Sequence, residues 1–258
     1  MPTYHPRVFR LNATLFLLLA VFIMHVCAVV RAEDVQKPHK PAPKEFQELP
    51  LLFDEHFDKP DKKQWELLDA DSWRFTVDKE RDDRTVLSLH RRSEYRAEHR
   101  SPYGIAWRKD LYVGDFVMDV WCRSTTKDYG HRDLCFYLGG QSPARFYYAH
   151  LGLKSDDTSN AVMIVNDAPR TKIVKDRTDG TRWSENYHHI RVVRKVEDGT
   201  IAVYMDDMKK PVMTAEDKTF RWGRVGVGSF DDTGHFDRIT LWGEKVERPD
   251  ENTTGDDS

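Results

Sequence analysis

The fold is decided by the stretch Ile190-Arg-Val-Val-Arg-Lys-Val-Glu-Asp-Gly-Thr-Ile-Ala-Val-Tyr-Met205. It contains two runs rich in β-branched residues, Ile190 to Val196 and Thr200 to Met205, and such runs favour β-strands. The residues between them, Glu197-Asp198-Gly199, are typical of a tight turn. The stretch therefore predicts a β-hairpin.

Other segments on both sides of this hairpin also repeat with period two. Side chains from Phe116 to Cys122 alternate between two sets, which predicts a strand with two different faces. Gly226 and Gly228 alternate with valine and serine, and a glycine inside a strand often marks a close approach to the backbone. Further strands are predicted over Leu134 to Leu138, Phe146 to Leu151, Ala161 to Val165 and Ile239 to Trp242. The predicted fold class is all-β, a sandwich of two antiparallel sheets.

Several stretches match a known pattern. The hairpin is preceded by Trp183-Ser-Glu-Asn-Tyr-His-His189, and Gly223-Arg-Val-Gly-Val-Gly-Ser-Phe230 is followed by Phe236-Asp-Arg-Ile-Thr-Leu241. These resemble the central hairpin and closing strands of concanavalin A-like jelly rolls, the lectin and glucanase superfamily that includes laminin G-like modules. Tyr112-Val-Gly-Asp-Phe-Val-Met-Asp-Val120 is similar to an early strand of one branch, the 3-keto-disaccharide hydrolase domain, also labelled glycoside hydrolase family 16-like. The resemblance covers Leu51 to Trp242 and implies a concanavalin A-like jelly roll.

The N-terminus predicts export. Arg7 and Arg10 precede an uncharged apolar run from Ala13 to Val30, and Ala32 suits cleavage after residue 32. Residues 1–32 are therefore interpreted as a signal peptide, with an uncleaved membrane anchor as the alternative. The predicted location is secreted, periplasmic or at the cell surface, with membrane contact only through an uncleaved signal segment.

The remaining chain divides into three parts. Residues 33–48 are rich in lysine and proline and predict a semi-extended linker. Residues 49–247 form the predicted sandwich, and residues 248–258 a disordered acidic tail. The formal charge is -3, and loss of the three arginines of residues 1–32 brings it to about -6, which argues against nucleic acid as a partner.

Two cysteines follow the predicted cleavage site, Cys122 and Cys135. The polar stretch Thr125 to Asp133 between them suggests a hairpin loop, which would place the two cysteines opposite each other on neighbouring strands. A disulfide suits an oxidising compartment. Two buried free thiols are the alternative, because directly paired cysteines on adjacent strands strain disulfide geometry.

The acid motif of retaining glucanases is missing. Its nearest counterpart is Asp115-Phe-Val-Met-Asp119, with Val117 in the middle. Residues four apart on a strand are separated by about 13 Å, whereas glycosidase carboxyls lie about 5 to 9.5 Å apart. Asp115 and Asp119 are therefore interpreted as polar strand residues.

Candidate site residues occur in loops and at strand ends, where polar and aromatic side chains suit sugar binding. They are His131, Arg132 and Asp133 before one strand, Tyr148 and His150 within another, Asn166, Asp167 and Arg170 after a third, and Asp231, Asp232 and His235 between the last two. Period two places Tyr148 and His150 on one face of their strand and Tyr147, Ala149 and Leu151 on the other, more core-like face.

Several of these residues have a structural alternative. His150 would also suit a satisfied buried histidine, and Asn166-Asp167 is typical of a turn. The pair Asp231-Asp232 fits a turn, a ligand-binding loop or oxygen ligands for calcium, the one cofactor that the sequence suggests. His188-His189 does not predict a zinc pair, because adjacent strand residues point to opposite faces.

Three functions fit these residues. The leading prediction is a glycan-recognising domain that binds oligo- or polysaccharide on one sheet face and its loops. The alternative, implied by the resemblance, is a hydrolase that cleaves 3-keto-glycosides by base-catalysed elimination and hydration. There His150 or Asp133 would be the base, and Arg170 and Tyr148 would stabilise the enolate oxygen. The second alternative is a structural or adhesive surface protein.

Overall fold

The computed structural model describes residues 40–248. The predicted signal peptide, residues 33–39 of the predicted linker and residues 249–258 of the predicted tail lie outside them. Within residues 40–248, no helix is long and apolar enough to cross a membrane. The regular structure there is almost all β, with three short 3-10 helices at Lys62–Gln64, Ala70–Ser72 and Lys79–Arg81.

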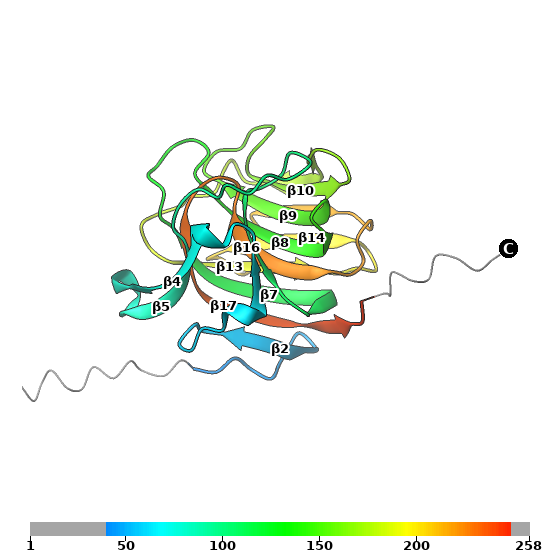
Figure 1. The fold of residues 1–258 in the computed structure, drawn as a ribbon. Helices are drawn as coiled ribbons and strands as arrows, with labels where there is room; N and C mark the ends of the chain where they lie inside the picture. Colours follow the sequence, from blue (N-terminus) through cyan, green and yellow to red (C-terminus); the bar gives the residue numbers. More distant parts are fainter. Residues whose placement is uncertain (1–39, 249–258) are drawn as a thin grey trace, which may run out of the picture. The chain divides into compact units, whose positions relative to one another are not determined.

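The strands form two antiparallel sheets (Figure 1). The ten-stranded sheet contains, in order, β1 (Glu45–Phe46), β2 (Leu49–Glu55), β17 (Gly234–Val246), β7 (Tyr112–Ser124), β13 (His188–Arg194), β14 (Thr200–Met205), β15 (Met213–Glu216) and β12 (Val174–Arg177). In addition, β5 (Arg84–Leu89) pairs with β17, and β4 (Trp73–Asp78) pairs with β5. The seven-stranded sheet runs in the order β11 (Thr171–Lys172), β10 (Ala161–Asn166), β9 (Arg145–Gly152), β8 (Asp133–Ser142), β16 (Arg224–Ser229), β6 (Gly104–Arg108) and β3 (Trp65–Leu67). The predicted antiparallel sandwich is confirmed.

The predicted central hairpin is present as β13 and β14. Ile190 pairs with Met205 and Arg194 with Ile201. Gly199 in the connecting turn has a φ of 83°, a conformation that glycine adopts without steric cost. The prediction that other groups approach the glycines of β16 is also confirmed, because a Cβ on Gly228 would collide with the carbonyl oxygen of Gly104.

Alternation along β9 separates two hydrophobic layers. Tyr147, Ala149 and Leu151 belong to the main core, with Met118 of β7 and Val192 of β13. Phe146 and Tyr148 belong instead to a second cluster with Trp107, Tyr137 and Phe230. The predicted division of this strand into two faces is therefore observed. The second cluster lies next to the polar groups described below and contributes Phe230 to them.

The cysteine hairpin is not observed. β7 pairs with β13 and β17, whereas β8 pairs with β9 and β16 in the other sheet. The polar segment after β7 therefore crosses between the sheets instead of returning beside β7. Cys122 and Cys135 are both free and buried, so the alternative of two free thiols is the observed one.

The folded region begins earlier than the predicted residue 49. Residues 45–46 form β1 against β2. The amide of Ala42 donates to Asp54 Oδ2 at 2.9 Å, and Trp242 Nε1 donates to the carbonyl oxygen of Pro43 at 2.8 Å. The proline-rich composition predicted a tether here, but residues 40–48 are held by hydrogen bonds to side chains of the sheet.

Candidate functional site

A small polar pocket lies where three central strands of the seven-stranded sheet begin or end. β8 lies between β9 and β16, and Cys135 is opposite both His150 and Gly228. Because the three strands are antiparallel neighbours, the start of β8 lies beside the ends of β9 and β16. The cavity has a volume of ≈ 190 Å³. Its lining comprises Arg100, Tyr129, His131, Asp133, His150, Thr158, Arg170, Phe230 and Asp231; we call it the His150 pocket.

Asp133 lies at the bottom of the His150 pocket and is fully buried. Its Oδ1 accepts hydrogen bonds from Ser229 Oγ at 2.7 Å and from the amide of Phe230 at 2.9 Å. Its Oδ2 lies 3.1 Å from His150 Nε2. Burial alone would raise the pKa of Asp133, but the His150 ring and these donors hold it below its ordinary value. Asp133 is therefore a buried carboxylate.

His150 lies between the carboxylate of Asp133 and the guanidinium of Arg170. Its Nε2 faces Asp133, and its Nδ1 lies 3.5 Å from Arg170 Nη1. Since a guanidinium can only donate, Nδ1 is the acceptor, and the ring proton of the neutral form lies on Nε2. The ring also stacks on Phe230 at 5.8 Å with an interplanar angle of 15°. These contacts fix both the tautomer and the orientation of His150.

Arg170 covers one side of the pocket. Its guanidinium lies 4.2 Å from the centre of the Phe230 ring, within cation-π range. It donates to Tyr148 Oη at 2.8 Å and to the carbonyl oxygen of Thr158 at 2.9 Å. Tyr148 is fully buried beneath it, and burial raises the pKa of the phenol. Tyr148 therefore supports Arg170 and does not line the cavity.

The adjacent acids Asp231 and Asp232 have different roles. Asp231 lines the pocket, and its Oδ2 lies 3.6 Å from Arg92 Nη2. Burial and the charge of Asp133 raise the pKa of Asp231. Asp232 turns away, because its Oδ2 accepts from the amide of Asp133 at 2.8 Å and its Oδ1 from Tyr129 Oη at 2.9 Å. Asp231 lines the cavity, whereas Asp232 ties the loop to β8.

We expect Asp232→Asn to stabilise the domain near pH 8 and not near pH 4. Burial and the charge of Asp133 raise the pKa of Asp232 from 3.8 to about 6. The folded chain therefore binds more protons than the unfolded chain between these pH values. The free-energy cost of ionising Asp232 in the folded chain is absent below about pH 4 and complete above about pH 6. After allowance for solvent screening, the gain is about 1 kcal/mol. Urea unfolding at both pH values measures it, and equal gains would contradict the assignment.

Not every predicted site residue reaches the pocket. Arg132 is fully buried and donates to the carbonyl oxygens of Ser124 and Ser184 at 2.9 and 3.0 Å, so it has no surface to offer a ligand. His235 lies in β17 of the other sheet, with Nδ1 2.7 Å from Asp78 Oδ2. Asn166 and Asp167 are exposed but do not line the cavity; Asp167 pairs with Arg145 at 3.1 Å. These positions have the polar character of site residues but are used for packing or turns.

Four residues that line the pocket were not predicted from sequence: Arg100, Tyr129, Thr158 and Phe230. Phe230 directly precedes the predicted Asp231-Asp232 pair. Its position beside a candidate loop is the sequence feature that could have indicated it. Arg100 ends the basic run His90-Arg-Arg-Ser-Glu-Tyr-Arg-Ala-Glu-His-Arg100. This run shows no alternation and was not assigned to a strand.

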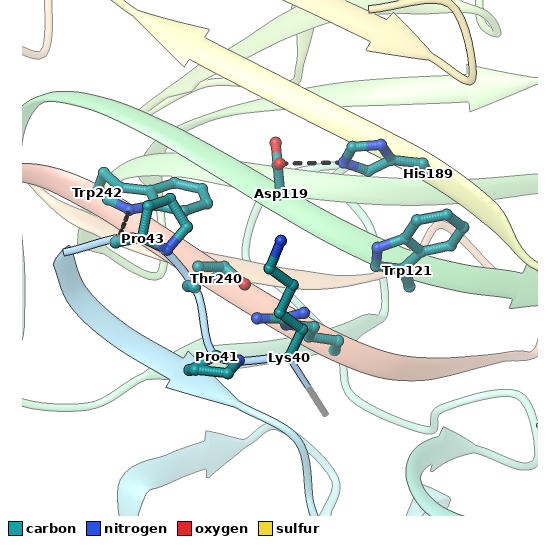
Figure 2. Close-up of a pocket in the computed structure, with 10 residues that line it drawn as sticks. Lys40, Pro41, Pro43, Asp119, Trp121, His189, Thr240 and Trp242 are labelled. Atoms are coloured by element: carbon teal, nitrogen blue, oxygen red, sulfur yellow. Dashed lines mark hydrogen bonds and ion pairs between the residues drawn. The ribbon is translucent and has the colours of Figure 1, made fainter. Parts of the chain in front are cut away.

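A second cavity, of ≈ 260 Å³, lies on the outer face of the ten-stranded sheet, next to Lys40–Pro43 (Figure 2). Asp119 accepts two hydrogen bonds from Arg191 at 2.6 and 2.7 Å and lies 3.1 Å from His189 Nε2. Trp121 stacks on the His189 ring at 4.8 Å. Asp119 is therefore paired with side chains of its own sheet.

The donor set for a metal differs from the one that the sequence suggested. Among residues 40–248, the cluster of His, Cys and acidic side chains that could hold an ion is Asp133, Cys135 and His150, with ligand atoms within 4.8 Å of one another. A thiol and an imidazole are poor ligands for calcium, which prefers oxygen. Burial also raises the pKa of Cys135 well above its ordinary value, which keeps the thiol protonated. Calcium at Asp231-Asp232 stays a prediction.

No protein-family model matches the sequence, and no curated protein matches it. Solved structures do match the fold. The carbohydrate-binding module CBM66 from Bacillus subtilis is 13% identical with a TM-score of 0.51, and the match covers 70% of this chain and 96% of that one. The chain has the fold of a concanavalin A-like jelly roll.

Two further structures share this jelly roll at similar distance. The cellulose-induced protein Cip1 is 11% identical with a TM-score of 0.51, covering 76% of this chain and all of that one. A mutant of the GH43 protein BlXynB from Bacillus licheniformis is 12% identical with a TM-score of 0.52, covering 80% of this chain but 41% of that one. At these identities the jelly-roll fold is the shared property.

Proposed function

We propose that this chain is an exported domain that binds carbohydrate in the His150 pocket. The observation that carries the proposal is the convergence of Asp133, His150, Arg170 and Asp231 on one cavity. These residues come from four segments that are far apart in the sequence. Carboxylate, imidazole and guanidinium groups hydrogen-bond sugar hydroxyls, and the face of Phe230 suits the C-H surface of a pyranose.

The size of the cavity limits what it holds. At ≈ 190 Å³, it is smaller than the roughly 300–1,000 Å³ of pockets for drug-sized ligands. We infer that one sugar unit enters it and that the rest of the glycan lies over the surrounding loops. The signal-like N-terminus supports export, and the shared fold with a carbohydrate-binding module supports glycans as the ligand class.

A glycan array tests this proposal. The full-length mature chain should bind at least one class of glycan, and Asp231→Ala should weaken that binding at least tenfold, about 1.4 kcal/mol, because it removes an acceptor from the cavity wall. Glu197→Ala is the matched control, since the Glu197 side chain is 93% exposed and far from the pocket in the sequence. Binding that both variants retain fully would rule out the His150 pocket as the site.

The second candidate function is cleavage of 3-keto-glycosides. It is favoured by the titratable set in one concave site, with Asp133 and His150 in contact and Asp231 on the wall. One of these groups would remove the C2 proton next to the ketone, and Arg170 would stabilise the enolate oxygen while the glycosidic oxygen leaves. Water then adds to the unsaturated product.

Product release from 3-keto-disaccharides distinguishes catalysis from binding. If the pocket is catalytic, His150→Gln and Asp133→Asn should each lower the rate by about 10²–10⁴-fold. Glu197→Ala again serves as control. Full activity in both pocket variants would remove this candidate and leave the binding function.

A further inference from the structure

Two guanidinium groups in the His150 pocket have no acidic partner among residues 40–248. Arg100 lies 6.0 Å and Arg170 4.2 Å from the centre of the same Phe230 ring. Arg170 donates to neutral acceptors: Tyr148 Oη, the carbonyl oxygen of Thr158 and His150 Nδ1. Within the described part of the chain, neither arginine forms an ion pair at 4.0 Å or less. Both cations are therefore available to a ligand.

Other arginines of the domain are neutralised in place. Arg191 donates two hydrogen bonds to Asp119, and Arg238 donates two to Asp54. These paired arginines show the geometry that a guanidinium favours with a carboxylate, two parallel N–H···O bonds. Among residues 40–248, Arg100 and Arg170 lack such a partner.

The acids of the pocket do not cancel these charges. The ring of His150 stands between Arg170 and Asp133, because one nitrogen faces each of them. Asp231 is paired with Arg92 at 3.6 Å. Arg92 and a further arginine, Arg96, also lie over the Tyr103 ring at 5.4 and 5.8 Å, so the segment before β6 adds positive charge at the rim.

We infer that the sugar bound in the His150 pocket carries an anionic group, a carboxylate or a sulfate ester, which is held by Arg100 and Arg170. This inference rests on the proposed carbohydrate-binding function. The Phe230 ring covers one side of the Arg170 guanidinium. This partial desolvation strengthens the attraction of Arg170 for an anion relative to bulk water.

Matched ligand pairs that differ only in charge test the inference. Galacturonate oligomers are compared with their methyl esters, and sulfated lactose with lactose, by calorimetric titration of the full mature chain. We expect the anionic member of at least one pair to bind at least tenfold more tightly. The carboxylate and sulfate arms distinguish the two sources of the charge.

Arg100→Gln assigns the preference to the pocket. Arg100 is exposed and its guanidinium contacts the Phe230 ring, so the variant should fold normally. It should weaken binding of the anionic ligand about tenfold more than binding of the matched neutral ligand. Arg182→Gln, an exposed arginine at a different cavity, is the matched control and should change neither.

Four results would overturn the inference. Equal binding of the charged and neutral members of each pair would contradict an anionic ligand but not the proposed function. A glycan array that yields neutral ligands alone would do the same. If Arg100→Gln retained the anionic preference, the anionic group would have to bind at another surface. Failure of every neutral and acidic glycan to bind would overturn the proposed function as well.

Discussion

Replacing Arg132 with alanine is expected to lower the free energy of unfolding by about 3–5 kcal/mol. The side chain is fully buried. It donates to Ser124 Oγ at 3.0 Å and to the carbonyl oxygens of Ser124 and Ser184. Alanine would leave these acceptors without a donor, next to a cavity that the surrounding chain fills only in part.

Urea unfolding near pH 7 measures this loss. Arg145→Ala is the matched control, because the Arg145 side chain is 42% exposed and its pair with Asp167 is solvated. Such surface pairs contribute about 0–1 kcal/mol. Arg132→Lys keeps the charge and one donor group, so it should lie between wild type and alanine. A loss below about 1 kcal/mol in Arg132→Ala would show that water replaces the guanidinium.

The position of Arg132 explains why the sequence assigned it to a ligand. It lies between His131 and Asp133, both of which line the pocket. In sequence, an arginine beside such residues has the same appearance whether it points outward or inward. The difference arises from β7 and the segment at Ser184, whose carbonyl oxygens surround Arg132 in the folded chain.

Local patterns predicted the strands well, because period two depends on neighbouring residues. The alternation along β9 correctly separated Tyr147 from Tyr148. It could not show where a strand goes next. The polar segment between Cys122 and Cys135 has the composition of a hairpin loop, but composition does not distinguish a return to the same sheet from a crossing to the other.

The candidate site was predicted in part for a similar reason. Asp133, His150, Arg170 and Asp231 were found from residue type and position at strand ends, and the order of strands in the sheet brings them together. Arg100 was missed because it lies in a segment without periodicity. Its role depends on a contact with Phe230, a residue far away in the sequence.

Asp133→Ala is the second variant for which we expect a loss of about 3–5 kcal/mol near neutral pH. Removal of the carboxylate leaves the amide of Phe230 and the hydroxyl of Ser229 without an acceptor. It also leaves His150 Nε2 without its partner. Asp133→Asn keeps one acceptor oxygen and loses the charge, so its loss should be smaller.

The pH dependence identifies the charge of Asp133 as the source of the loss. The fold lowers the pKa of Asp133 below 3.8, so its stabilising effect is complete above that value and disappears as the pH falls through the folded-state pKa. The difference between wild type and Asp133→Asn should therefore shrink on acidification from about pH 7 to about pH 3.

Asp231→Asn is the control for this trend, because the fold raises the pKa of Asp231. Its carboxylate is disfavoured in the folded chain, so the substitution should cost nothing near neutral pH. A loss for Asp133→Asn that stays constant with pH would mean that shape and hydrogen bonding, and not charge, account for it. The two aspartates should show opposite trends, because the fold lowers the pKa of the buried Asp133 and raises the pKa of Asp231 on the cavity wall.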